Sequence, residues 1–215
     1  TANTTASDNV AVGSCSLKSN TTGANNIAVG ARALCTVTTG IKNIAIGTEA
    51  LRYNTGSNNT AIGYLALDAN TTGSSNTAVG ESALGANTTG ASNTAVGFQS
   101  LKPVTTGYDN TGIGHEAGQL MTTGTCNVLL GRAAGATITT GSNNVAIGFE
   151  TIANNAATGS NNTVVGFCAG APITTGANNV LLGSNAQANA INSQFEVVIG
   201  ANATGKGTNT GMIGG

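Results

Sequence analysis

The sequence is unusually poor in charged and aromatic side chains. Charged residues make up 7% of the 215 residues, aromatic residues make up 3%, and tryptophan is absent. Soluble globular domains usually contain about 25% charged residues. A core built from large side chains is therefore excluded. With a formal net charge of −1, the chain also has no basic surface that could hold nucleic acid or anionic lipid.

Proline and long apolar runs are scarce as well. Only two prolines are present, and glycine does not recur at every third position, which excludes a collagen helix. No apolar run approaches the roughly 18 residues that a transmembrane helix needs, so we expect no membrane insertion in this segment. The sequence begins at Thr1, without an initiating methionine and without the pattern of a signal peptide. We therefore expect the chain to be a mature or excised part of a longer protein.

What the sequence does contain is repetition. Glycine, threonine, alanine and asparagine supply 127 of the residues. The pattern Asn-x-Ala-[Val/Ile]-Gly, or a close variant of it, recurs at every seventeenth position, apart from one interval that is shorter by one and one that is longer by one. The glycines that close it, called here the motif glycines, are Gly13, Gly30, Gly47, Gly63, Gly80, Gly97, Gly114, Gly131, Gly148, Gly166, Gly183 and Gly200.

This period predicts the fold class. A helical hairpin repeat needs roughly 33 residues or more, whereas a 17-residue unit suits one coil of a β-solenoid. We therefore predict an all-β protein, a parallel β-solenoid (a β-roll or β-helix) of about 12–13 coils. It forms a single domain over residues 1–215, with 17-residue repeats to about residue 200 and a 14-residue terminal coil over residues 201–215.

The apolar columns suggest which face of each strand lies inside. The positions three and one before each motif glycine carry Val, Ile, Leu or Thr, and they share one face of a strand because side chains alternate. We expect this aliphatic face to lie inside the coil. We expect a second short strand to close the core from the other side through leucines four residues after a motif glycine: Leu34, Leu51, Leu67 and Leu84.

An asparagine column stands four residues before the motif glycines. Stacked asparagines can bond to one another from coil to coil and accept turn conformations, so we interpret the column as a structural ladder. Its members are Asn26, Asn43, Asn59, Asn76, Asn93, Asn110, Asn127, Asn144, Asn162 and Asn179.

The column between the two aliphatic positions predicts assembly. If the aliphatic face lies inside, this column lies outside as an apolar stripe, and such stripes mark interfaces. Three chains around one axis would bury it, so we expect a parallel homotrimer. The column becomes bulkier where the leucines are replaced by Gly118, Gly135 and Gly170, which predicts a shift of hydrophobic mass from the coil interior to the trimer axis. The candidate interface is Ala28, Ala45, Ala61, Ala78, Ala95, Leu129, Val164, Leu181 and Val198.

Residues that could carry chemistry are isolated. His115 neighbours Glu116, but adjacent strand residues point to opposite faces, so we expect a surface histidine. Arg32 and Glu49 share a column in adjacent coils and are expected to form a surface ion pair. Four cysteines show neither metal-ligand nor disulfide spacing, which predicts free, mostly buried thiols and leaves pairing between the chains of a trimer open. We predict a protein that is not an enzyme and has no cofactor or metal site.

Two surface patterns remain. Tyr64, Phe98, Phe149 and Phe167 each follow a motif glycine directly, and these candidate surface aromatics could stack on sugar rings or pack at a corner. Threonine and asparagine rows in Thr-Thr-Gly turns raise an alternative function, an ice-binding (antifreeze) solenoid. The adjacent threonines of these turns point apart, which disfavours that alternative.

The repeats also carry a family resemblance. The segment NTTGSSNTAVGESALGANTTGASNTAVGFQSL, residues 70–101, resembles the repeats of phage and giant-virus tail fibres. The final VVIGANATGKGTNTGMIG, residues 197–214, is similar to the head repeats of bacterial trimeric autotransporter adhesins, since Gly200 and Gly214 are separated by the shorter, 14-residue spacing of those repeats. The resemblance implies a left-handed parallel β-roll trimer. It also implies an extracellular fibre or adhesin, on a virion or bacterial surface, that attaches to a host glycan or protein receptor.

Overall fold

The structure is a computed structural model that describes residues 5–153 and 156–214. Its contacts divide the chain into two units of similar size, residues 1–108 and 109–215, which we call unit 1 and unit 2 and describe separately. Both units have the same architecture, a parallel β-solenoid in which each coil contributes one strand of three residues. Helices are absent from the part of the chain that the structure describes. The prediction of a β-solenoid is confirmed, and the single-domain organisation of residues 1–215 stays a prediction.

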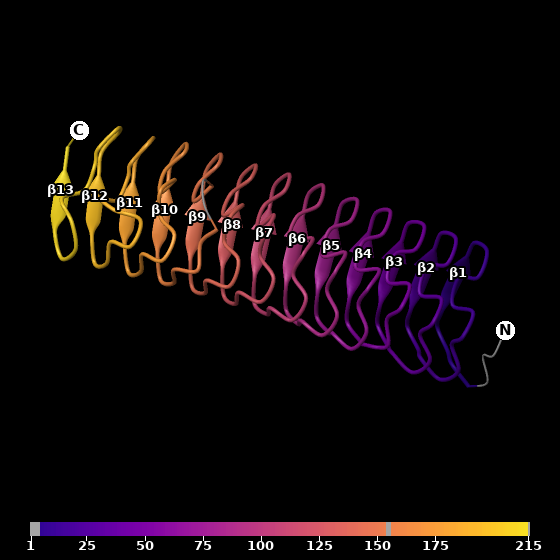
Figure 1. Cartoon of the computed structure of the whole chain (residues 1–215). Coiled ribbons are helices and arrows are strands. Elements are labelled where there is room, and N and C mark those ends of the chain that lie inside the picture. The colour runs from indigo at the N-terminus through magenta and orange to yellow at the C-terminus, as the bar shows by residue number, and fades with distance from the viewer. Residues whose placement is uncertain (1–4, 154–155, 215) are drawn as a thin grey trace. The chain divides into compact units, whose positions relative to one another are not determined.

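Within each unit, the strands follow one another in chain order and lie side by side along one wall of the coils (Figure 1). The strands of unit 1 are β1 (Val10–Val12), β2 (Ile27–Val29), β3 (Ile44–Ile46), β4 (Thr60–Ile62), β5 (Thr77–Val79) and β6 (Thr94–Val96). The strands of unit 2 are β7 (Thr111–Ile113), β8 (Val128–Leu130), β9 (Val145–Ile147), β10 (Thr163–Val165), β11 (Val180–Leu182), β12 (Val197–Ile199) and β13 (Gly211–Ile213).

Strand pairing preserves the sequence columns. Ala45 pairs with Ala61 between β3 and β4, and Val164 pairs with Leu181 between β10 and β11. The last pair, in which Val198 of β12 pairs with Met212 of β13, differs only in its shorter connection. Equivalent residues are therefore stacked at the interstrand distance of roughly 4.8 Å, and each column becomes a line of neighbouring side chains.

The middle residue of every strand from β2 to β12 is buried inside the coil, which overturns the predicted arrangement. Every member of the candidate interface is fully buried within the single chain: Ala28, Ala45, Ala61, Ala78, Ala95, Leu129, Val164, Leu181 and Val198. The aliphatic columns on either side point outward, and Ile46 and Ile62 remain 40% and 38% exposed. The prediction that the alanine column forms an oligomer interface is wrong. A three-residue strand places one side chain inside, and the narrow interior opposite the leucines has room for alanine.

The opposite wall of the core comes from the turn after the strand. Leu34, Leu51 and Leu67 are fully buried although their φ angles of 48°, 49° and 51° lie in the left-handed region. That conformation costs roughly 1–2 kcal/mol for a residue with a side chain. Burial of a leucine contributes about 1.5–3 kcal/mol and offsets this cost. The leucine closes the core as predicted, from a strained turn rather than from a second strand.

In two coils of unit 2 the two walls exchange their large and small residues, whereas the coil of Ala146 and Ile152 keeps the arrangement of unit 1. A Cβ atom added to Gly135 would lie 2.6 Å from Cδ2 of Leu129, and one added to Gly170 would lie 2.8 Å from Cγ1 of Val164. The larger strand residue therefore fills the space that the turn leucine fills elsewhere. The predicted transfer of hydrophobic mass to a trimer axis is wrong, because the mass stays inside the coil and moves from one wall to the other.

The motif glycines are required by the contact between coils. Gly13 has a φ of 126°, and a Cβ atom on it would lie 2.6 Å from the carbonyl oxygen of Gly30 in the next coil. Both the backbone conformation and the close approach therefore exclude other residues. This explains the strict glycine column without any ligand.

Candidate interaction surfaces

The asparagine column forms a buried ladder of hydrogen bonds. In unit 1, the Oδ1 atom of Asn43 accepts the backbone N–H of Asn59 at 3.0 Å, and its Nδ2 atom donates to the carbonyl oxygen of Gly56 at 3.0 Å. In unit 2, Asn144 makes the same two bonds, to Asn162 and Gly159, both at 3.0 Å. These side chains are buried, and their amide groups are hydrogen-bonded to the backbone. They therefore join neighbouring coils and are not accessible to a ligand.

The ladder ends on a buried glutamate that the sequence reasoning did not single out. Glu196 stands in the asparagine column, and its backbone N–H donates to Oδ1 of Asn179 at 3.0 Å. Its carboxylate accepts the backbone N–H groups of Asn189 at 3.0 Å and Gly207 at 2.7 Å. The glutamate thus binds two loop amides next to the shorter terminal coil. Its position four residues before Gly200 was the available sequence signal.

Unit 1 contains a second, interrupted asparagine column seven residues after the motif glycines. Nδ2 of Asn70 donates to Oδ1 of Asn54, and Nδ2 of Asn87 donates to Oδ1 of Asn70, each at 2.7 Å. Val37 and Val104 occupy the same column. The Oδ1 atoms of Asn20 and Asn87, the asparagines that precede these valines, are buried without a hydrogen-bond partner. Each interruption therefore leaves an orphaned acceptor.

The outer face of the sheet is a continuous aliphatic surface in each unit. We call it the aliphatic face, and it consists of the first and third residues of the strands. In unit 1 its third-position side chains include Val12, Val29, Ile46, Ile62, Val79 and Val96, all exposed or half-buried. In unit 2 they include Ile113, Leu130, Ile147, Val165, Leu182 and Ile199. The chain itself therefore leaves these apolar side chains partly uncovered.

The candidate surface aromatics lie at the turn that follows the strands, but they do not form one row. Tyr64 and Phe98 are exposed, and Glu81 stands between them in their column. Phe149 and Phe167 are adjacent in unit 2 and stack, with ring centroids 5.2 Å apart and planes inclined by 7°. The guanidinium of Arg132, one coil earlier, lies 5.1 Å from the centroid of the Phe149 ring. Sequence reasoning missed Arg132, although it shares the column directly after the motif glycines.

Ionisable side chains pair with one another on the surface. The Nη1 atom of Arg32 lies 2.8 Å from Oε1 of Glu49, as predicted, and Arg52 contacts the other carboxylate oxygen at 3.3 Å. The hydrogen bond from Arg32 lowers the pKa of Glu49, and the bond raises the pKa of Arg32 in turn. Burial raises the pKa of Asp68, against a smaller opposing effect of the backbone N–H of Ala69. Charged side chains here pair with one another, and the Arg32–Glu49 pair joins neighbouring coils.

The structure brings His115 and Glu116 together, contrary to the expectation that they point apart. Nδ1 of His115 lies 3.5 Å from Oε2 of Glu116. The alternation rule fails here because the two residues lie in a turn, where Glu116 has a φ of 56°. Both side chains are partly exposed.

The cysteines are free throughout the described residues, as predicted. Cys15 and Cys126 are exposed and Cys35 and Cys168 are half-buried, so the expectation that these thiols are mostly buried is wrong. Burial raises the pKa of the Cys168 thiol, and the negative charge of Glu150 adds to this effect. Among residues 5–153 and 156–214, no group of three or more His, Cys, Asp or Glu side chains could hold a metal ion. None of the described segments is a helix long and apolar enough to cross a membrane.

Some threonine hydroxyls of the Thr-Thr-Gly turns are engaged in hydrogen bonds between coils. The hydroxyl of Thr71 donates to the backbone carbonyl oxygen of Thr88 at 2.9 Å. In the same way, the hydroxyl of Thr88 donates to the backbone carbonyl oxygen of Thr105 at 3.1 Å. Thr21 makes the equivalent bond to Thr38. The first threonine of these turns therefore links neighbouring coils instead of presenting a free hydroxyl to solvent.

Comparison with known proteins yields no match: no family model, curated protein or solved structure is significantly similar to this chain.

Proposed function

We propose that this chain is a non-enzymatic structural and adhesive fibre segment that acts outside the cell, in a viral tail fibre or a bacterial surface adhesin. In this proposal it assembles as a parallel homotrimer and mediates attachment to a host or other surface. The observation that carries it is the aliphatic face, which runs along the strands of each unit and is left uncovered by the chain itself.

The geometry of this face favours association between identical chains. Each strand presents two outward side chains, mostly Val, Ile or Thr, and each coil repeats them in register. Three copies arranged around one axis would place their three aliphatic faces against one another. The outward strand side chains of every coil would then be buried. Each buried Val or Ile side chain contributes about 1.5–3 kcal/mol. The repetition of the coils multiplies this contribution. A solenoid whose small residues form only a narrow core would thus gain stability from the other two chains of the trimer.

The polar surface supports a structural role. The Arg32–Glu49 and Arg132–Glu150 contacts join neighbouring coils, and Arg52 pairs with Glu49 within its own coil, so these charges are paired with each other. The buried asparagines are bound to backbone groups in the same way. Side chains that elsewhere perform chemistry are here engaged in holding coils together.

Sedimentation equilibrium of the whole chain tests the assembly. We expect the mass of three chains at micromolar concentration. Ile62→Asp, which places a charge on the aliphatic face, should shift the mass toward that of one chain while the circular dichroism of the coils persists. Thr72→Asp, on an exposed turn, is the matched control and should leave the mass unchanged. A wild-type chain that sediments as a monomer would overturn the trimer.

The ice-binding alternative has one observation in its favour. On the outer face of β4, β5 and β6, Thr60, Thr77 and Thr94 form a line beside Ile62, Val79 and Val96. Regular threonines on a flat solenoid face could order water. Measurement of thermal hysteresis separates the two proposals: clear hysteresis would favour ice binding, whereas its absence together with binding of the labelled trimer to cells would favour the fibre.

A further inference from the structure

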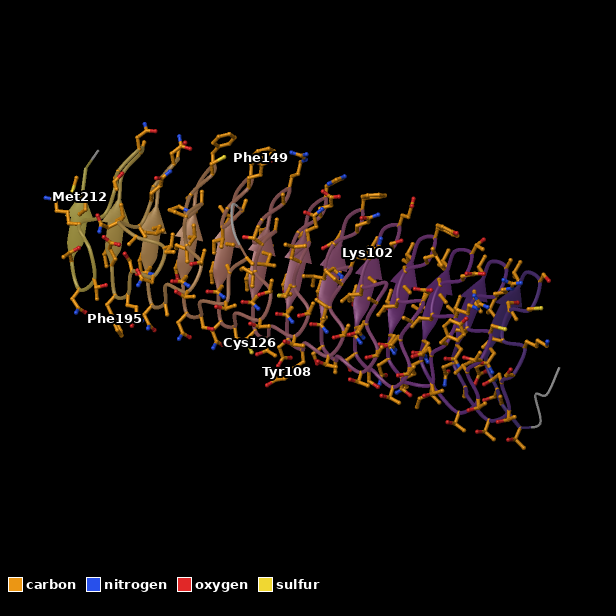
Figure 2. All side chains as sticks on the ribbon, in the orientation of Figure 1. Lys102, Tyr108, Cys126, Phe149, Phe195 and Met212 are labelled. Carbon is orange, nitrogen blue, oxygen red and sulfur yellow. The ribbon has the colours of Figure 1, made fainter. Side chains whose placement is uncertain are left out.

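The most elaborate surface cluster outside the aliphatic face is the stack of Arg132, Phe149 and Phe167. The three residues each follow a motif glycine in consecutive coils of unit 2. The guanidinium covers one face of the Phe149 ring, and the Phe167 ring covers the other in a nearly parallel arrangement. Figure 2 places Phe149 at the turn beyond the strands, whereas Cys126 and Phe195 lie at the opposite turn of the same unit. The stack is therefore separate from the aliphatic face.

The stack ends with one aromatic face uncovered. Phe167 is 54% exposed, and the next residues in its column are the small Ser184 and Ala201. The following coil nevertheless lies directly alongside, because the backbone N–H of Asn185 donates to the carbonyl oxygen of Phe167 at 2.8 Å. Beyond Phe167, the column thus offers a flat aromatic surface beside backbone that carries only short side chains.

Polar groups border this surface. Nδ2 of Asn185 donates to Oδ1 of Asn202 at 3.1 Å, which holds the two amides in line. This bond leaves the Oδ1 atom of Asn185 as an acceptor and the Nδ2 atom of Asn202 as a donor, and the hydroxyl of Ser184 lies on the same coil as Asn185. The nearby charges of Arg132 and Glu150 form a pair at 3.5 Å and largely cancel.

We propose that Phe167, Ser184, Asn185 and Asn202 form a binding site for one neutral hexopyranose unit of a surface glycan. A hexopyranose ring carries axial C–H groups on at least one face, and such a face can stack on an aromatic ring. Its hydroxyls lie around the edge and need both donors and acceptors, which the two amides and the serine hydroxyl supply. Phe149 and Arg132 hold the Phe167 ring in place from below. The proposal rests on the adhesive part of the proposed function and names its ligand class.

Saturation-transfer NMR on the whole chain tests the site. The probes are methyl β-galactopyranoside, methyl β-glucopyranoside and methyl α-mannopyranoside, each at millimolar concentration. We expect transfer from the protein to the axial ring protons of at least one glycoside, with an upfield shift of those protons from the ring current of Phe167. Phe167→Ala should abolish both signals, Phe167→Tyr should retain them, and Asn185→Ala should weaken binding several-fold.

Phe195→Ala is the matched control, because Phe195 is 56% exposed and lies at the opposite turn (Figure 2). It should leave the saturation transfer unchanged. The absence of transfer to all three glycosides would overturn the site, and so would an equal loss in Phe195→Ala and Phe167→Ala. Neither result affects the trimer, which is measured by sedimentation. Failure of the sugar site and failure of the proposed assembly can therefore be told apart.

Discussion

The coils of unit 1 and two coils of unit 2 fill the same narrow core in opposite ways. In unit 1, alanine stands in the middle of the strand and leucine closes the turn, as in the coil of Ala78 and Leu84. In unit 2, Leu129 stands on the strand opposite Gly135, and Val164 opposite Gly170. The turn residue has the same left-handed conformation in both cases, with a φ of 50° at Leu84 and 61° at Gly135. The backbone is conserved while the source of the core volume changes.

This difference shows that the coil specifies a volume rather than a residue at each position. Protein interiors are close-packed, so a large side chain on one wall requires a small one on the other. Glycine on the turn also removes the cost of holding leucine in a left-handed conformation. Two arrangements of similar stability are therefore available to the same backbone, and the repeat can change from one to the other along the chain.

A double-mutant cycle at Leu129 and Gly135 gives the largest expected effect. Leu129→Ala should open a cavity and cost about 2–5 kcal/mol. Gly135→Leu should overpack the core, at a cost of about 1–3 kcal/mol, because its Cβ atom would lie 2.6 Å from Leu129. The double variant recreates the arrangement of unit 1 and should recover most of the loss. Denaturant unfolding of the four chains measures the coupling.

The mirror-image cycle in unit 1, Ala78→Leu with Leu84→Gly, is the control for this comparison. It should show the same compensation if the walls are interchangeable. Losses that simply add in both cycles would mean that the two residues do not share one volume, and the comparison would fail.

The second asparagine column gives a smaller effect, which should differ between the units because the neighbours in the column differ. Val37 lies between Asn20 and Asn54, so an asparagine there would complete a ladder and use the orphaned Oδ1 atom of Asn20. Ile138 lies between Met121 and Ala157, where an amide would find no such partners. Ile138→Asn should cost about 1–3 kcal/mol through an unsatisfied buried group. Val37→Asn should be nearly neutral.

Thermal melts of the two asparagine variants make the measurement. The matched controls are Val37→Ala and Ile138→Ala, which remove the same apolar groups without adding an amide. A Val37→Asn variant that is less stable than Val37→Ala would show that the interrupted ladder cannot be completed.

Several features of this fold can be predicted from the sequence because they depend on columns alone. The 17-residue period determines the solenoid, and the column positions of Asn43 and Asn59 or of Arg32 and Glu49 are sufficient to pair them. The inner face of the strand is different. Both faces of a Val-Ala-Val strand are apolar, so hydrophobicity alone does not distinguish the inner face from the outer one. Side-chain size alone then favours the valines for the interior, which is the wrong face. The size of the interior decides the orientation, and it is set by the turn leucines in three dimensions.

The turn contacts were equally inaccessible to pattern reasoning. The pairing of His115 with Glu116 and the burial of Leu84 both depend on left-handed φ angles at residues other than glycine. Sequence patterns mark such conformations mainly through glycine and asparagine. The stack of Phe149 and Phe167 is partly predictable. Their shared column predicts that the two side chains are close, but it does not predict the parallel arrangement of the rings.

The smallest effect concerns two carboxylates of unit 1 whose pKa values move in opposite directions. The pKa of Glu49 is lowered by the hydrogen bond from Arg32, so its stabilising contribution is present above the ordinary pKa of a glutamate, about 4.3, and is lost as the pH falls through the lowered value. The pKa of Asp68 is raised by burial. Its contribution is therefore present below the ordinary pKa of an aspartate, about 3.9, and is lost as the pH rises through the raised value.

Melting temperatures of Glu49→Gln and Asp68→Asn across the acid range should consequently deviate from wild type with opposite signs. At neutral pH, Glu49→Gln should melt slightly lower, and the deficit should shrink as the pH falls below about 4. Asp68→Asn should melt slightly higher at neutral pH, and its advantage should vanish in acid. High salt should reduce the Glu49 effect, because the Arg32–Glu49 pair lies at the surface and its arginine is 55% exposed, so that salt screens it. Salt should leave the Asp68 effect in place, because desolvation rather than a charge partner causes it. Equal deviations of one sign in both variants would show that neither the ion pair nor the burial of Asp68 governs the acid response of unit 1.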